Sequence, residues 1–218
     1  MRRSIALASL GLLTTAPLAA QDFQSFCSGT VPITVGRWAS YQFTGGRADG
    51  STMRMAIIGS ERFGDSTYYW YELQTTAPSG KKPNHTILQI LMAGIASPQV
   101  ALRGFIMKNN DQPAMRAPDM MVGMMGRSFT SGVSQYLEQH CKKGGMQVLG
   151  IESVTVPAGT FRASHIKDDE GGEAWVARDV GVFAMVKVLY KDGMVMELTG
   201  RGSDAKSAIT ETPQQMMH

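Results

Sequence analysis

The residues that decide the fold of this chain are 182–199, VFAMVKVLYKDGMVMELT. Phe183, Met185 and Leu189 alternate with Val182, Val186 and Val188, and this period of two is typical of a β-strand. Asp192-Gly193 is a two-residue turn sequence, after which 194–199 can return as a second strand. The stretch therefore predicts an antiparallel hairpin.

The same pattern extends along most of the chain in both directions. A second hairpin is predicted around Pro157-Ala158-Gly159-Thr160, and Gly64-Asp65 can form a third turn. Further strands are expected at 37–43, 53–58, 68–75, 86–92, 100–107, 146–156, 161–167 and 173–177. Residues 86–92 and 100–107 are almost continuously apolar, which indicates strands buried on both faces, although a short helix would look the same.

The segment between Asn109 and Gly145 breaks this rhythm. Val133, Tyr136 and Leu137 have the spacing of one helical face, and Ser131 can cap a helix there. Just before it, residues 118–126 indicate a short helix that is apolar almost all the way round. We therefore predict an α+β fold, with a strongly curved antiparallel half-barrel of about 9–11 strands and a helical plug inserted near 117–143.

The first twenty residues have the features of a secretory leader. Arg2 and Arg3 precede an apolar run at 5–13, and cleavage is expected between Ala20 and Gln21. We expect the mature chain in the periplasm or outside the cell, as one domain over 21–203 followed by a polar, flexible tail at 204–218. The apolar run of the leader is too short to anchor the chain across a bilayer. No transmembrane segment is expected in the mature chain.

The mature chain is close to neutral. The 218-residue chain has 21 basic and 18 acidic residues, a formal charge of +3, and loss of Arg2 and Arg3 with the leader lowers this to +1. No basic stripe remains for a nucleic-acid partner.

The sequence contains two cysteines, Cys27 and Cys141. In an exported protein an even pair favours a disulfide, although two unpaired thiols stay an alternative. Such a bridge would join the mature N-terminus to the middle of the chain.

Methionine is unusually frequent, with 16 residues. The flexible, polarisable side chain of methionine repacks around varied apolar shapes. One hypothesis is a concave cavity plugged by the apolar segment, with a lipid-like ligand contacting Met120, Met121, Val122, Met124, Met125 and Trp175. The alternative is that these side chains are ordinary core residues.

The sequence from Glu152 to Phe161 (ESVTVPAGTF), with Trp175 and Asp179-Val180-Gly181, resembles a signature of exported bacterial domains. These domains are similar to the superfamily of periplasmic lipoprotein carriers and outer-membrane lipoprotein acceptors, the Lol-type proteins. The resemblance covers about 146–207. It implies an antiparallel half-barrel closed over by helices, and it supplies no catalytic residues.

No pattern of catalytic or metal-binding residues is visible. The four histidines are scattered, without the spacing of metal ligands, and a G-x-S-x-G nucleophile elbow is absent. We therefore predict no enzyme activity, no metal and no cofactor.

Three classes of function remain. The first is a binding or carrier protein for an apolar or amphipathic ligand. The second is a structural or interaction protein of the cell envelope, with a partner chain at an edge strand. The third, a hydrolase, would need convergent polar groups that the sequence does not provide.

Overall fold

The computed structural model describes residues 32–80, 82–93, 101–137, 141, 145–182 and 184–216. The predicted leader and Cys27 lie outside these residues. Cys141 is half-buried and has an interaction partner, but the predicted Cys27–Cys141 disulfide stays a prediction.

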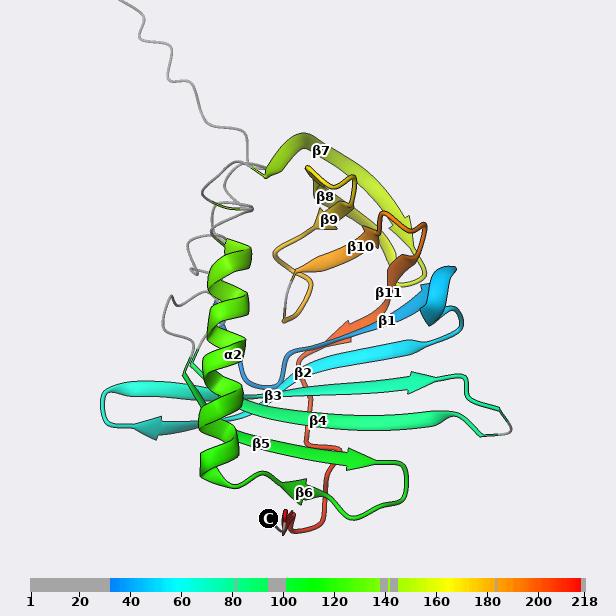
Figure 1. Ribbon diagram of the computed structural model, residues 1–218. Coiled ribbons are helices and arrows are strands. Elements are labelled where there is room, and N and C mark those ends of the chain that lie inside the picture. Colours follow the sequence, from blue (N-terminus) through cyan, green and yellow to red (C-terminus); the bar gives the residue numbers. More distant parts are fainter. Residues whose placement is uncertain are drawn as a thin grey trace, which may run out of the picture.

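The described chain forms one twelve-stranded sheet with the strand order β12-β6-β5-β4-β3-β2-β1-β11-β10-β9-β8-β7. All neighbouring strands are antiparallel except β12 and β6, which pair in parallel. The strands are β1 (Trp38–Thr44), β2 (Thr52–Phe63), β3 (Ser66–Ala77), β4 (Asn84–Met92), β5 (Leu102–Asn109), β6 (Met115–Arg116), β7 (Met146–Val156), β8 (Gly159–Asp168), β9 (Glu173–Val176), β10 (Met185–Leu189), β11 (Val195–Gly202) and β12 (Gln214–Gln215). A 3-10 turn, η1 (Gly46–Ala48), follows β1, and one α-helix, α2 (Asp119–Leu137), lies between β6 and β7 (Figure 1).

The predicted α+β class was wrong. The described chain is mostly strand with one α-helix, and its sheet is open rather than closed over by helices. The two predicted helical segments form one continuous helix, in which Ser131 is internal and its hydroxyl donates to the carbonyl of Arg127 at 2.9 Å. Serine in this position bonds back to the preceding turn and caps nothing.

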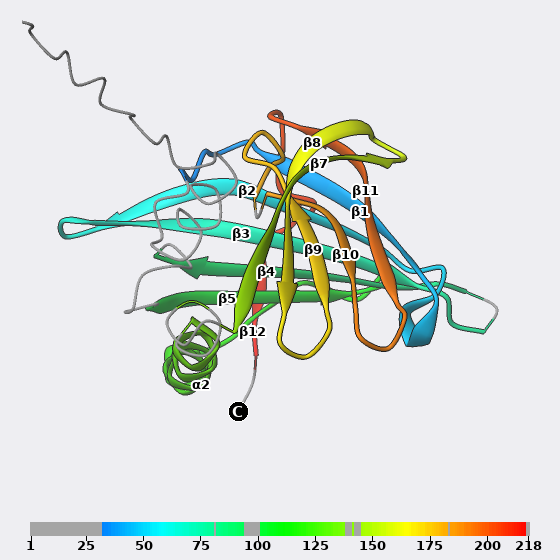
Figure 2. The same cartoon turned by 90° about the horizontal axis from the view of Figure 1, so that it is seen from above.

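The helical plug was also wrong. Met120, Met121 and Met124 are 73%, 43% and 58% exposed, whereas Val122 is buried. An amphipathic helix lying against one side of a sheet leaves its opposite side in water, even where that side carries methionine. Figure 2 shows α2 beside the sheet, near β5, instead of within a barrel.

One half of the sheet, which we call the closed half, consists of β1 and β7 to β11. Figure 2 shows these strands curling over, and β7 contacts β10 and β11 although neither is its neighbour in the sheet. The turn before β8 is attached to β11, where the amide of Ala158 donates to the carbonyl of Leu198 at 3.0 Å. The curl encloses a continuous core that includes Ala39, Tyr41, Phe161, Val186, Met196 and Leu198.

The other half, which we call the open half, consists of β2 to β6. Cross-strand pairs place Glu72, Gln89 and Ile106 on one face, which we call the outer face, and Tyr71, Ile90 and Phe105 on the other, the inner face. On β1 and β2 the inner face contributes Phe43, Met53 and Met55 to the core of the closed half.

The residues after β11 cover the outer face of the open half, and we call 203–216 the strap. At its start the indole Nε1 of Trp38 donates to Asp204 at 2.8 Å, and at its end β12 pairs with β6. Between these points Ile209 is buried against Ile87 and Ile106. The tail predicted as flexible is therefore docked across the sheet (Figure 1), because this one apolar side chain and several polar ones find partners there.

A buried carboxylate anchors the middle of the strap. Glu72 is 2% exposed and accepts hydrogen bonds from Gln74 Nε2 and Gln89 Nε2, both at 2.8 Å, and from the amide of Ala208 at 2.9 Å. A buried charge is tolerated only when hydrogen bonds replace its water. Part of this replacement comes from the strap itself.

Candidate functional site

A shallow apolar groove of about 620 Å³ lies between α2 and the inner face of the open half. Ile90 from β4, with Leu102 and Phe105 from β5, forms its sheet side, and Met124 and Met125 form its helix side. Arg127 and Ser128, one turn further along α2, complete the lining. An apolar lining with few polar groups, in a volume within about 300–1,000 Å³, is typical of small-molecule sites.

Close packing of the helix on β5 positions the groove. A Cβ added at Gly126 would lie 3.3 Å from the Cβ of Leu102, so glycine allows this approach. Gly123 has open space around the same position and serves no such purpose. Gly126 is thus a site of close packing between α2 and β5.

The inner face beside the groove is incompletely covered. Ile57, Tyr71 and Met92 are buried, and the half-buried Val182 packs against them. Half-buried apolar side chains continue along β4 and β5: Leu88, Ile90, Phe105 and Met107. Apolar side chains left partly in water favour contact with any apolar molecule that can cover them. The groove is the place where helix and sheet can contact such a molecule from two sides.

The sequence-predicted residues separate in the structure. Met124 and Met125 line the groove, whereas Met120 and Met121 are exposed and Val122 is buried outside its lining. Ile90, Leu102 and Phe105 were predicted only as strand residues. Their near-continuous apolar pattern was the available signal, but it indicated burial on both faces.

Trp175 lies on β9, away from the groove lining, within a polar cluster. Its ring stacks on His165 with centroids 4.3 Å apart, and its indole Nε1 donates to Glu152. His165 also lies 3.0 Å from Glu173, whose pKa is lowered by hydrogen bonds from Lys167 and His165. Trp175 and His165 thus pair with Glu152 and Glu173 across neighbouring strands, so the arrangement is that of a cross-strand network.

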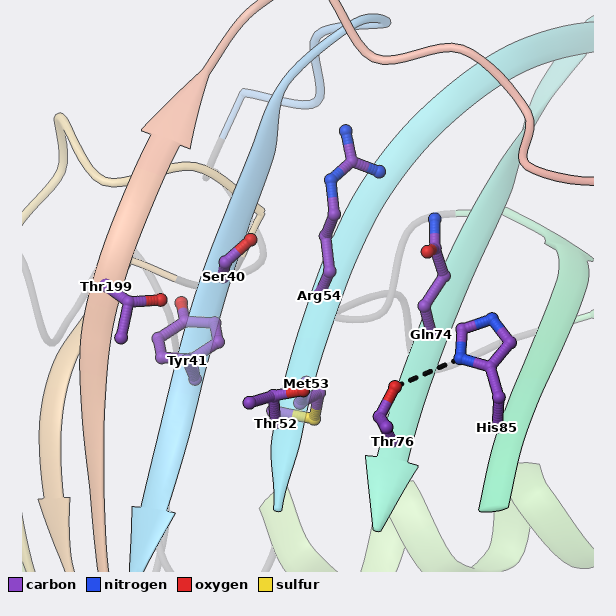
Figure 3. A pocket seen from close by; sticks show the side chains of 9 residues that line it. All are labelled: Ser40, Tyr41, Thr52, Met53, Arg54, Gln74, Thr76, His85 and Thr199. Carbon is purple, nitrogen blue, oxygen red and sulfur yellow. Dashed lines mark hydrogen bonds between the residues drawn. The ribbon is translucent and has the colours of Figure 1, made fainter. Parts of the chain in front are cut away.

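A second hollow, of about 280 Å³, lies on the outer face, and most of the residues that line it have polar side chains. Figure 3 shows Arg54 and Gln74 projecting on the same side of the sheet, and His85 Nδ1 lies 3.0 Å from the Thr76 hydroxyl. Arg54 also stacks on Trp38, 4.9 Å from its ring centroid. The volume is below the range of most ligand sites, so the apolar groove is the better candidate.

Among the described residues, α2 is not apolar enough for a membrane span, and no three His, Cys, Asp or Glu side chains are grouped to hold a metal ion.

Comparison with known proteins gives little further information. No family model and no curated protein matches the chain. Two solved structures are similar to it: a proposed exported protein with a YmcC-like fold from Bacteroides fragilis and a proposed lipoprotein from Parabacteroides distasonis. Each is 12% identical, with a TM-score of 0.36, and each match covers 78% of this chain and 97% of the other. Because this TM-score is too low to assign the fold, the Lol-type resemblance and the periplasmic location stay predictions.

Proposed function

We propose that this protein is an exported, non-enzymatic binding protein that holds the acyl chain of an amphipathic molecule in the groove between α2 and β5. The observation that carries the proposal is the half-exposed apolar inner face, where Ile90 and Phe105 face two methionines of α2. Covering this surface would release water from apolar area, which favours binding by about 25 cal/mol per Å².

Methionine suits this purpose because its unbranched thioether adapts to chains of different shape. Met125 is half-buried and Met124 is 58% exposed, so both can move without opening a packed core. The predicted leader supports an extracytoplasmic location, where amphipathic molecules of the envelope are present.

The experiment uses delipidated mature protein and lysophosphatidylcholine with one myristoyl chain, measured by calorimetry. We expect saturable binding that Met125→Glu weakens by about tenfold or more, because a charge in an apolar site is costly to desolvate. The matched control is Met120→Glu, on the same helix but outside the groove lining.

Circular dichroism establishes that both variants are folded. Equal loss of binding in the two variants, or no binding by the unmodified protein, would contradict the proposed site. Native mass spectrometry of protein purified gently from a bacterial periplasm gives an independent check: a bound species in the lipid mass range is expected, and it should disappear after solvent extraction.

A further inference from the structure

We infer that the groove selects amphiphiles with an anionic headgroup and that Arg127 holds this headgroup while the acyl chain lies against Ile90 and Phe105. This inference rests on the proposed function and adds the chemical class of its ligand. It makes Arg127 a specificity-determining residue, a role that nothing in the sequence pattern indicated.

The order of residues along α2 is the first argument. Residues three and four positions apart lie on the same side of a helix, so Arg127 and Ser128 follow Met124 by about one turn. All three line the groove, together with Met125. The groove therefore changes from apolar to polar along the helix axis, as an amphiphile changes from chain to headgroup.

The charge of the lining is the second argument. Among the described residues that line the groove, Arg127 is the one charged residue, and none is a carboxylate. Lys108, Lys187 and Arg201 pair with Glu211, Glu197 and Asp179, at 2.5, 3.0 and 2.6 Å. Within the described part of the chain, Arg127 has no such ion pair, so its guanidinium is available to a ligand.

The chemistry of the guanidinium is the third argument. Its planar arrangement of N–H donors fits the two oxygens of a phosphate or carboxylate, and these bonds are stronger than bonds between neutral groups. The exposed hydroxyl of Ser128 can donate a further hydrogen bond. A phosphodiester or carboxylate at the end of one acyl chain meets both requirements.

The test compares two probes with the same myristoyl chain: lysophosphatidylglycerol, which is anionic, and lysophosphatidylcholine, which is zwitterionic. We expect the unmodified protein to prefer the anionic probe by about fivefold, equivalent to about 1 kcal/mol for a charge pair near the surface. Arg127→Gln should remove this preference, because it should weaken binding of lysophosphatidylglycerol by about fivefold more than binding of lysophosphatidylcholine, whose phosphate is balanced by its own choline cation.

The matched control is Arg116→Gln. Arg116 pairs with Ile106 on the outer face and stacks over Trp70, 5.8 Å from its ring centroid, so it belongs to the opposite side of the same sheet. This variant should keep the full preference for the anionic probe. Loss of preference in both variants would attribute the effect to net charge and overturn the role of Arg127.

The remaining outcomes separate the two proposals. Equal affinity of the unmodified protein for both probes overturns the anionic selection and leaves the acyl-binding function intact. Absence of binding by either probe overturns the function itself. Glycerophosphoglycerol, the headgroup without a chain, should not compete; strong competition by it would show a site for a free phosphodiester and overturn selection of an amphiphile.

Discussion

The closed and open halves of the sheet bury their side chains by different means. In the closed half the strands curl over one another, and Val186, Met196 and Leu198 are at most 1% exposed. In the open half the sheet is too flat to cover itself, and other segments must cover it. The strap covers the outer face, and α2 covers part of the inner face.

As a consequence, a polar side chain on β4 is more buried than the apolar side chain next to it. Gln89, on the outer face, is 5% exposed, whereas its apolar neighbour Ile90, on the inner face, is only half-buried. On β3 the charged Glu72 is likewise more buried than Leu73. Polar side chains are usually more exposed than their apolar neighbours, so this reversal is informative. It shows that the outer face is covered and that the inner face, on the groove side, is not.

The largest expected difference between the halves is in core stability. Leu198→Ala in the closed half should lower the free energy of unfolding by about 4 kcal/mol, because its surroundings cannot collapse into the space. Leu88→Ala on the inner face of the open half should cost only about 1 kcal/mol, since water already reaches that side chain. Urea unfolding of both variants measures the difference, and equal losses would contradict the distinction between the halves.

A smaller effect is expected where the strap holds the open half. Ile209→Ala should cost about 2 kcal/mol, near the lower limit for a buried isoleucine, because a strap can readjust more easily than a strand. Hydrogen exchange should accelerate at β3 to β5 and remain unchanged at β8 to β10. Faster exchange throughout the sheet would mean that the strap stabilises the whole domain.

The smallest effect concerns pH. The Trp38 indole lowers the pKa of Asp204, and Lys108 lowers that of Glu211, from ordinary values of 3.8 and 4.5. A lowered folded-state pKa stabilises the docked strap fully above those values, and this contribution is lost as pH falls through the lowered pKa. We expect exchange of the strap amides to accelerate below about pH 4, after correction for intrinsic rates.

The double variant Asp204→Asn, Glu211→Gln provides the control for this pH effect. It removes both carboxylates while preserving side-chain size, so the acid-dependent step should disappear. Persistence of the same step in the double variant would assign it to other groups.

Much of the strand pattern could be predicted from the sequence. Ten strands were expected, and all ten are present; β7 agrees to the residue. The two-residue strands β6 and β12 were missed, because Met115-Arg116 and Gln214-Gln215 are too short to show a period of two. β6 pairs with the end of β5, and β12 forms where the strap meets β6.

The groove was less predictable than the strands. Alternation assigns Ile90 and Phe105 to one face, but it does not say whether that face will be covered. The methionines of α2 were recognised as a group, yet only the helix orientation separates Met124 and Met125 from exposed Met120. No local sequence pattern marks Arg127, since its place in the groove lining depends on the packing of α2 against β5.

The pairing of β1 with β11 joins the first strand of the sheet to one of its last, and it connects Trp38 with Gly202. Contacts between residues so distant in sequence close a long loop and slow folding. The sheet therefore cannot be completed until almost the entire chain is available, and the strap, which follows β11, can dock only after that step. Before completion, the edge of β1 is open to pairing with other chains, so a chain held unfolded would benefit from a holdase until its last strands arrive.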